Sequence, residues 1–184
     1  VSGPSMMEDL QKQAERFGSR LIFEDVTAVD LTTRPFEVKT DEAVFRADSV
    51  IVATGASARW LGLESEQKYV NLGVSACATC DGALYRGKPL AVVGGGDTAL
   101  EEALFLTRFG SSVTVIHRRD ALRASRIMQE RALAHEKIDF AWDSVVEEVL
   151  GGEFLTGVRL RNLKSDAMRD LAVEGLFIAI GHQP

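Results

Sequence analysis

The spacing of apolar and polar residues changes several times along the chain, and each change predicts a different element. Residues 5–17 place five apolar side chains at the 3.6-residue spacing of a helix, and Gly18 follows where a helix commonly ends. The apolar positions are Met6, Met7, Leu10, Ala14 and Phe17. This pattern predicts an amphipathic helix at the start of the chain.

Short runs rich in β-branched and aromatic residues follow this helix, separated by turn-forming residues. The predicted strands are residues 20–23, 26–31, 36–40 and 43–46. They indicate one strand followed by a small antiparallel meander. Residues 49–55 then predict a buried strand that ends on Gly55. Residues 56–74 show weak periodicity and several turn formers, which is typical of a connector.

The second half of the chain alternates strand and helix patterns. Residues 88–93 and 112–116 predict buried strands, and residues 97–109 and 125–134 predict the helices that follow them. Such a βαβα order is typical of an α/β fold with a doubly wound, Rossmann-like parallel sheet. Further strands are predicted at residues 138–142, 145–150, 155–162, 168–173 and 175–181.

Composition narrows the functional classes. The 184-residue chain is 46% hydrophobic and carries a net charge of −6, with Lys and Arg dispersed along it. It therefore lacks the basic stripe that nucleic-acid binding requires. No apolar run approaches the roughly 20 residues that span a bilayer, so we expect a cytoplasmic protein with no membrane partner. Because the chain does not start with Met, we also expect it to be a fragment.

A glycine-rich motif lies between the predicted strand 88–93 and the helix after it. Its residues are Gly94, Gly95, Gly96, Asp97, Thr98 and Ala99. In a dinucleotide site the first glycine permits a tight turn, the next lets backbone approach the pyrophosphate, and a small residue allows close helix–strand packing. Thr98 and Glu101 also match a capping box. An ordinary strand–turn–helix is the alternative interpretation.

The end of the strand at residues 112–116 indicates which nucleotide would bind. A site for NAD usually has an acidic residue there, about 20 residues after the glycines, to bind the ribose 2′-hydroxyl. This chain instead has His117, Arg118 and Arg119, with Arg123 one turn later. Guanidinium groups bind phosphate oxygens in bidentate geometry, which favours the 2′-phosphate of NADPH. A solvated basic turn is the alternative.

Cys77 and Cys80 are the two cysteines of the chain, and their spacing is typical of a redox dithiol. Half of a zinc site and two unrelated buried thiols are the alternatives, although a second cysteine pair for zinc is missing. Asp81 could exchange protons during thiol–disulfide chemistry, or it could simply be a turn residue before Gly82. Since a nicotinamide does not reduce a disulfide efficiently in one step, a flavin intermediary is expected.

Together these motifs resemble bacterial-type, low-molecular-weight thioredoxin reductase, and the likeness extends over essentially the whole chain. Four segments carry it in the family's order: residues 75–82, 94–103, 117–124 and 175–184. The resemblance implies that residues 1–54 are part of an FAD-binding domain. Residues 55–181 would be the NADPH-binding domain with the cysteine pair, and residues 182–184 would start the return to the FAD domain. The N-terminal FAD fingerprint and the C-terminal FAD segment of that family are missing from this sequence.

The resemblance also implies a route for electrons. NADPH would reduce FAD, FAD would reduce the Cys77–Cys80 disulfide, and the dithiol would reduce thioredoxin. Cys80 matches the cysteine nearest the flavin, Cys77 the one that attacks thioredoxin, and Asp81 the acid. Val26, Thr54 and Gly55 fall where the family approaches FAD. The family is homodimeric and rotates one domain against the other.

Two alternative functions stay open at this point. The flavoprotein component of alkyl hydroperoxide reductase shares the architecture but normally adds an N-terminal thioredoxin-like module. A nucleotide-binding module without turnover would describe a chain that binds NADPH but does not retain FAD.

Overall fold

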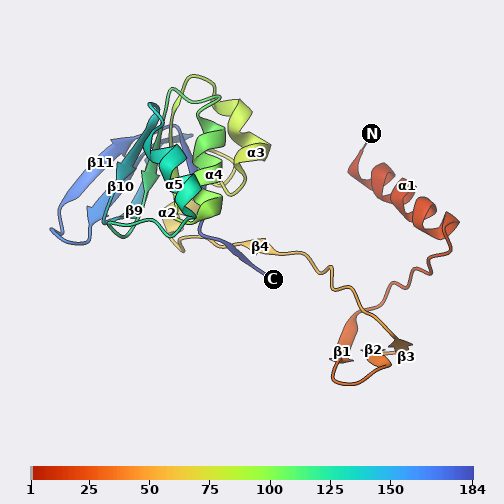
Figure 1. The fold of residues 1–184 in the computed structure, drawn as a ribbon. Coiled ribbons are helices and arrows are strands. Elements are labelled where there is room, and N and C mark those ends of the chain that lie inside the picture. Colours follow the sequence, from red (N-terminus) through yellow and green to blue (C-terminus); the bar gives the residue numbers. More distant parts are fainter. Residues whose placement is uncertain (1) are drawn as a thin grey trace. The chain divides into compact units, whose positions relative to one another are not determined.

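The chain folds into two compact units, Val1–Thr54 and Gly55–Pro184, in a computed structural model that describes residues 2–184 (Figure 1). Among the described residues, no helix combines the length and the apolar character that crossing a bilayer demands.

The first unit contains helix α1 (Gly3–Arg16) and strands β1 (Val26–Asp30), β2 (Phe36–Thr40) and β3 (Val44–Ala47). Ser2 caps α1, since its hydroxyl accepts a hydrogen bond from the Ser5 amide at 3.4 Å, and a proline occupies the first turn. The three strands form an antiparallel sheet in the order β1-β2-β3. The predicted helix and meander are therefore present.

Two strands predicted in this unit are not formed. Residues 20–23 and 49–55 adopt irregular backbone, and Ile51 and Val52 are 92% and 70% exposed. A strand needs a neighbouring strand to bond its amides and carbonyls, and neither segment has one within residues 2–184. The prediction of a strand at residues 20–23 and that of a buried strand at residues 49–55 are therefore wrong for this chain.

The second unit is built on a five-stranded parallel sheet. Its strands are β5 (Val74–Ser75), β12 (Gly175–Ile178), β6 (Pro89–Val93), β7 (Ser112–Ile116) and β8 (Ile138–Ala141), in that order across the sheet. Helices α4 (Asp97–Leu106) and α5 (Arg126–Leu133) connect β6 to β7 and β7 to β8. The predicted α/β class with a parallel sheet is confirmed.

Both faces of this sheet are covered, which explains why its strands read as continuous apolar runs. Leu90 and Val92 belong to one core cluster with Leu100 and Leu106 of α4. Side chains on the opposite face of the strands, such as Val93, belong to a second cluster. This cluster also contains residues of a three-stranded antiparallel sheet. That sheet comprises β9 (Ser144–Gly151), β10 (Leu155–Asn162) and β11 (Met168–Ala172). The unit thus has three layers: helices, parallel sheet and antiparallel sheet.

Residues 56–74 contribute to the core rather than only connecting elements. They contain β4 (Ser57–Ala58), which pairs with β13 (His182–Gln183), and helix α2 (Glu64–Lys68). Glu66 is fully buried, and its two carboxylate oxygens accept the amides of Leu61 and Gly62 at 2.9 and 3.0 Å. Tyr69 packs in the second cluster. The connector interpretation missed this role because the segment is too short and irregular to show a period.

Candidate functional site

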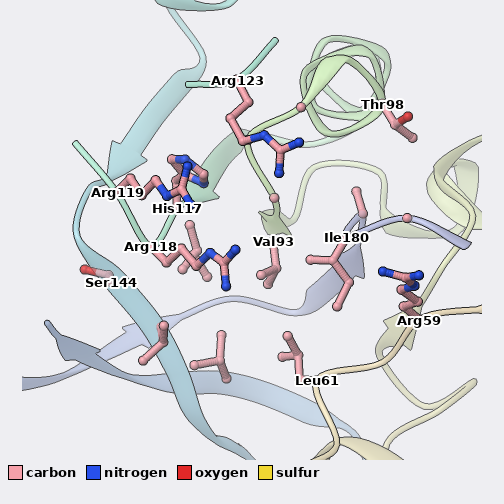
Figure 2. Close-up of a pocket in the computed structure, with 18 of the residues that line it drawn as sticks. Arg59, Leu61, Val93, Thr98, His117, Arg118, Arg119, Arg123, Ser144 and Ile180 are labelled. Atoms are coloured by element: carbon pink, nitrogen blue, oxygen red, sulfur yellow. The ribbon is translucent and has the colours of Figure 1, made fainter. Parts of the chain in front are cut away.

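A cavity of about 720 Å³ opens at the carboxyl ends of β6, β7 and β12, where open parallel sheets commonly bind ligands (Figure 2). Most of the residues predicted to bind the nucleotide line this cavity: Gly94, Gly95, Gly96, Asp97, Thr98, His117, Arg118, Arg119 and Arg123. Ala99 instead packs in the core behind it, fully buried. Residues 94–98 and 117–123, which are separated in the sequence by α4 and β7, therefore meet at one site.

Gly94 and Gly96 have different structural roles. Gly94 adopts a φ of +152°, and a side chain there would overlap the Ala99 methyl group and the Ala179 carbonyl. Gly96 is the N-cap of α4 and has nothing within 4 Å of the position of a β-carbon. Its backbone therefore borders open space where a ligand can approach closely.

The predicted capping box of α4 is not formed. No side chain caps this helix, so Thr98 and Glu101 do not make the reciprocal bonds that we expected. The first amides of a ten-residue helix then stay free to face the cavity, an arrangement that suits an anionic group. The box failed because Gly96, rather than Thr98, occupies the N-cap.

His117 holds the two cavity loops in contact with each other. Its ring is buried against Gly95, and its Nε2 lies 3.0 Å from the Ala121 carbonyl oxygen. Burial is the main cause that lowers the pKa of His117, and the neighbouring arginine charges add to it. The imidazole therefore favours its neutral form, which can donate to Ala121 and shape the loop.

Backbone and carboxylate bonds fasten the same loops together. The Gly95 carbonyl accepts the amides of Arg123 and Ala124 at 2.7 and 3.1 Å. The Asp97 carboxylate accepts the amide and the hydroxyl of Ser125 at 2.9 and 2.6 Å, and these bonds lower its pKa. Asp97 thus lines the cavity and also anchors the loop between β7 and α5, called the basic loop below because it carries three arginines.

The arginine side chains give the cavity its charge. Arg118 and Arg123 extend their guanidinium groups into the open space, and Arg59 lies on its other side (Figure 2). The nearest acidic residue in the basic loop, Asp120, binds Lys164 at 2.8 Å instead. The geometry therefore places cations where an extended, phosphate-bearing ligand would lie.

Several cavity residues were missed from the sequence, and Arg59 is the most informative of them. It comes from the stretch interpreted as a connector, and its amide donates to the Gly181 carbonyl oxygen at 3.0 Å. Leu61, Ser144 and Ile180 also line the cavity. An isolated arginine in a stretch of weak periodicity carries no local pattern, so only the pairing of β4 with β13 reveals its position.

The cysteine pair lies on a separate turn. Cys77 is the N-cap of helix α3 (Ala78–Asp81), is bonded to Cys80 in a disulfide, and its Sγ accepts the Cys80 amide at 3.2 Å. The Asp81 carboxylate accepts the Ser75 hydroxyl at 2.7 Å, and that hydroxyl accepts the Cys77 amide at 3.0 Å. Neither cysteine lines the nucleotide cavity. Transfer of electrons from a ligand in the cavity to the disulfide would therefore need a carrier.

Comparison with known proteins identifies the family. The family model described as pyridine nucleotide-disulphide oxidoreductase matches residues 4–184. The chain belongs to this family. It is 55% identical to a thioredoxin reductase of Streptomyces coelicolor and 51% identical to one of Coxiella burnetii, in each case over 100% of the chain.

The solved thioredoxin reductase of Giardia duodenalis matches this member of the oxidoreductase family with a TM-score of 0.83 and 41% identity, over 99% of the chain and 60% of that structure. The chain also covers 58% and 59% of the Streptomyces and Coxiella proteins. It thus spans about three fifths of the length of these relatives.

None of the three residues expected near FAD is among those that line the cavity. Val26 is the first residue of β1 and is 58% exposed. Thr54 and Gly55 lie in irregular backbone, and Gly55 has a φ of +79°. Their role as flavin contacts stays a prediction.

Proposed function

We propose that the protein containing this chain is an NADPH-dependent thioredoxin reductase. The observation that carries the proposal is an accessible Cys77–Cys80 disulfide within the unit that also holds an arginine-lined dinucleotide cavity. The identity to proteins named thioredoxin reductase supports the choice of thioredoxin as the disulfide substrate.

In this proposal the glycine turn and the free amides of α4 hold the pyrophosphate of NADPH. Arg118, Arg119 and Arg123 hold the 2′-phosphate, and His117, Asp97 and Thr98 shape the cavity around them. Arg59, at the other side, is placed to contact the remaining half of the dinucleotide.

The disulfide turn supplies the thiol chemistry. FAD, when bound, supplies a two-electron relay from a nicotinamide to a disulfide. Cys80, which is exposed, is the cysteine proposed to meet this relay, and Cys77 is proposed to attack the disulfide of thioredoxin. Asp81, bonded to Ser75 beside Cys77, is proposed to exchange the proton that the leaving thiolate requires.

We assign residues 1–54 to part of an FAD-binding domain, residues 55–181 to the NADPH-binding domain and residues 182–184 to the return segment. Exposed apolar side chains in the first unit, including Ile51 and Val52, support its being part of a larger domain. Gly55, with its positive φ, follows them and suits a close approach to FAD, with Val26 and Thr54 as further contacts. The same proposal makes the complete protein a cytoplasmic homodimer, on the strength of its motif resemblance.

The nucleotide assignment is tested by calorimetric titration of the chain with NADPH and NADH. Replacing Arg118 and Arg119 with Ala should weaken NADPH binding at least about tenfold for each charge-assisted hydrogen bond lost. Binding of NADH, which lacks the 2′-phosphate, should change little.

Arg126→Ala is the matched control, because Arg126 is exposed, pairs with Glu130 at 2.8 Å and does not line the cavity. Equal losses for both nucleotides in the double variant would contradict the 2′-phosphate assignment.

The dithiol assignment is tested in the full-length protein with Cys77→Ser and Cys80→Ser. Each variant should lose thioredoxin reduction, because a single thiol cannot complete a two-electron exchange. Bleaching of the flavin by NADPH should persist in stopped-flow absorbance, since it precedes the thiol step. Turnover retained in either variant would overturn the assignment, and NADPH binding without turnover in the unmodified protein would favour the bare nucleotide-binding alternative.

A further inference from the structure

A carboxyl group of α4 lies close to the start of α3, the short helix that carries the disulfide. Glu102 is on α4, which packs against α3, and the nearby amide of Ala78 acts to lower the pKa of its carboxyl group. Ala78 follows Cys77 immediately, is 1% exposed and is the first residue of α3. One turn further along α4, the Leu106 side chain packs against Gly82. The Glu102 carboxyl therefore belongs to the packed contact between the two helices.

This carboxyl is incompletely satisfied where it lies. Its Oε2 is buried and has no hydrogen-bond partner in the described residues 2–184. A buried carboxylate oxygen without a partner is costly, whereas a protonated carboxyl there removes the charge. The site therefore favours the neutral acid more than water does.

The surrounding charges act in the same direction. Burial, and then the neighbouring charge of Glu101, raise the pKa of Glu102 to about 7, although the Ala78 amide opposes this. On α3 the ionisable groups are Asp81 and, after reduction, the cysteines; η1 (Gly82–Tyr85) adds Tyr85, whose pKa is raised by burial and by Asp81. The charged residues of α5 are exposed, and β6 and β7 contain none. These packed elements bring no buried cation to the carboxylate.

Reduction of the disulfide changes the charge on this turn. The oxidised pair is neutral, whereas a reduced pair near neutral pH can hold a thiolate, which the Cys80 amide at 3.2 Å from the Cys77 sulfur would stabilise. A thiolate of Cys77, the N-cap of α3, and the Glu102 carboxylate near Ala78 are like charges, and like charges raise each other's proton affinity.

We propose that Glu102 is a positioning residue whose protonation is linked to the dithiol: it takes up a proton when the disulfide is reduced and releases it when the disulfide forms again. The inference rests on the proposed function only in taking the cysteine pair as redox-active. It adds a proton store near the pair, distinct from Asp81 beside it.

The step balances as follows. Two electrons from a reductant, here dithiothreitol, break the S–S bond and leave dithiothreitol as its cyclic disulfide. One of the two protons released goes to a cysteine sulfur, the second goes to the Glu102 carboxylate, and the other sulfur stays a thiolate. With Gln at position 102, only the first proton is taken up.

The test is a redox titration of the 184-residue chain in dithiothreitol buffers from about pH 6 to about pH 9, with thiols alkylated and counted by mass spectrometry. Glu102→Gln keeps the size of the side chain and a carbonyl oxygen, and it removes the proton site. Above pH 7 the equilibrium constant for reduction should depend more steeply on pH in the unmodified chain than in the variant. The difference should reach up to about tenfold per pH unit, which corresponds to about 30 mV in the reduction potential.

Glu101→Gln is the matched control, since it removes the same charge from the adjacent, exposed residue. It should keep the steep region and move it to lower pH, because Glu101 contributes to the raised pKa of its neighbour. Equal pH dependence in Glu102→Gln and the unmodified chain would overturn the linkage.

A measurement on the unmodified chain covers the case in which the variant does not fold. The infrared difference spectrum on reduction at about pH 8 should gain the carbonyl band of a protonated carboxyl. Absence of that band would overturn the linkage alone. A disulfide that dithiothreitol cannot reduce would overturn the proposed function, and the linkage with it.

Discussion

The three glycines at positions 94–96 shape the cavity because they lack a side chain. Gly94 is required by a positive φ and by the nearby Ala99, whereas Gly95 is required by the His117 ring that lies on it. Gly96 has free space where a side chain would stand. A glycine is thus required at each of these adjacent positions for a different physical reason, and substitutions at the three positions should have different effects.

Gly95→Ala should destabilise the fold by about 1–3 kcal/mol, the usual cost of overpacking. The added methyl group would overlap the His117 ring and displace it from the Ala121 carbonyl and from the edge of Trp142. Thermal unfolding monitored by circular dichroism measures this effect.

Gly96→Ala is the matched comparison, because its methyl group meets nothing within 4 Å. Its stability should stay within about 0.5 kcal/mol of the parent. Its affinity for NADPH should fall in calorimetry, since the methyl group faces the proposed pyrophosphate. If both variants lost the same stability, the packing argument for Gly95 would be wrong.

At the scale of elements, the site depends on two βα loops that are joined to each other. The loop before α4 supplies the free amides, and the loop before α5 supplies the arginines. Asp97 and the Gly95 carbonyl connect them through Ser125, Arg123 and Ala124. The connection sets the distance between the proposed pyrophosphate and 2′-phosphate positions.

Asp97→Ala should therefore weaken NADPH and NADH binding together, in contrast to the arginine variants. Removing a negative charge near a phosphate site would by itself favour binding, so Asp97→Asn is the control: it removes the charge but keeps an oxygen for Ser125. In calorimetry the Ala variant should bind both nucleotides several-fold more weakly than the Asn variant, as expected for a lost hydrogen bond of about 1 kcal/mol. Equal affinities of the two variants would show that the connection does not position the loops.

At the scale of the whole molecule, every residue that lines the cavity and both cysteines lie in the unit Gly55–Pro184. This unit also contains both hydrophobic core clusters. Its termini are joined by the pairing of β4 with β13, which places Arg59 at the cavity. The unit therefore has the properties of an independently folding domain.

A chain that begins at Gly55 should consequently fold by itself and bind NADPH with the affinity of the 184-residue chain. Cooperative thermal unfolding and calorimetric titration of the two chains, under the same conditions, provide the measurement. A loss of more than about tenfold in affinity would show that residues 1–54 contribute to the nucleotide site.

The sequence by itself determined the elements and the motifs whose causes are local. The helix and strand periods, the glycine turn at residues 94–96 and the Cys77–Cys80 spacing all follow from steric and hydrogen-bonding rules that act over a few residues. For that reason the α/β class and the meander were predicted correctly, and the glycine turn and the arginines that line the cavity were singled out from the sequence.

Only the tertiary structure decided the features that depend on partners distant in the chain. Residues 49–55 have the composition of a buried strand, but within residues 2–184 they have no strand to pair with. The predicted capping box is not formed because Gly96 is the N-cap of α4. Arg59 reaches the cavity through β13, and Glu102 reaches the disulfide turn through the packing of α4 on α3. Pairing and burial are properties of two segments at once, and the pattern within either segment does not contain them.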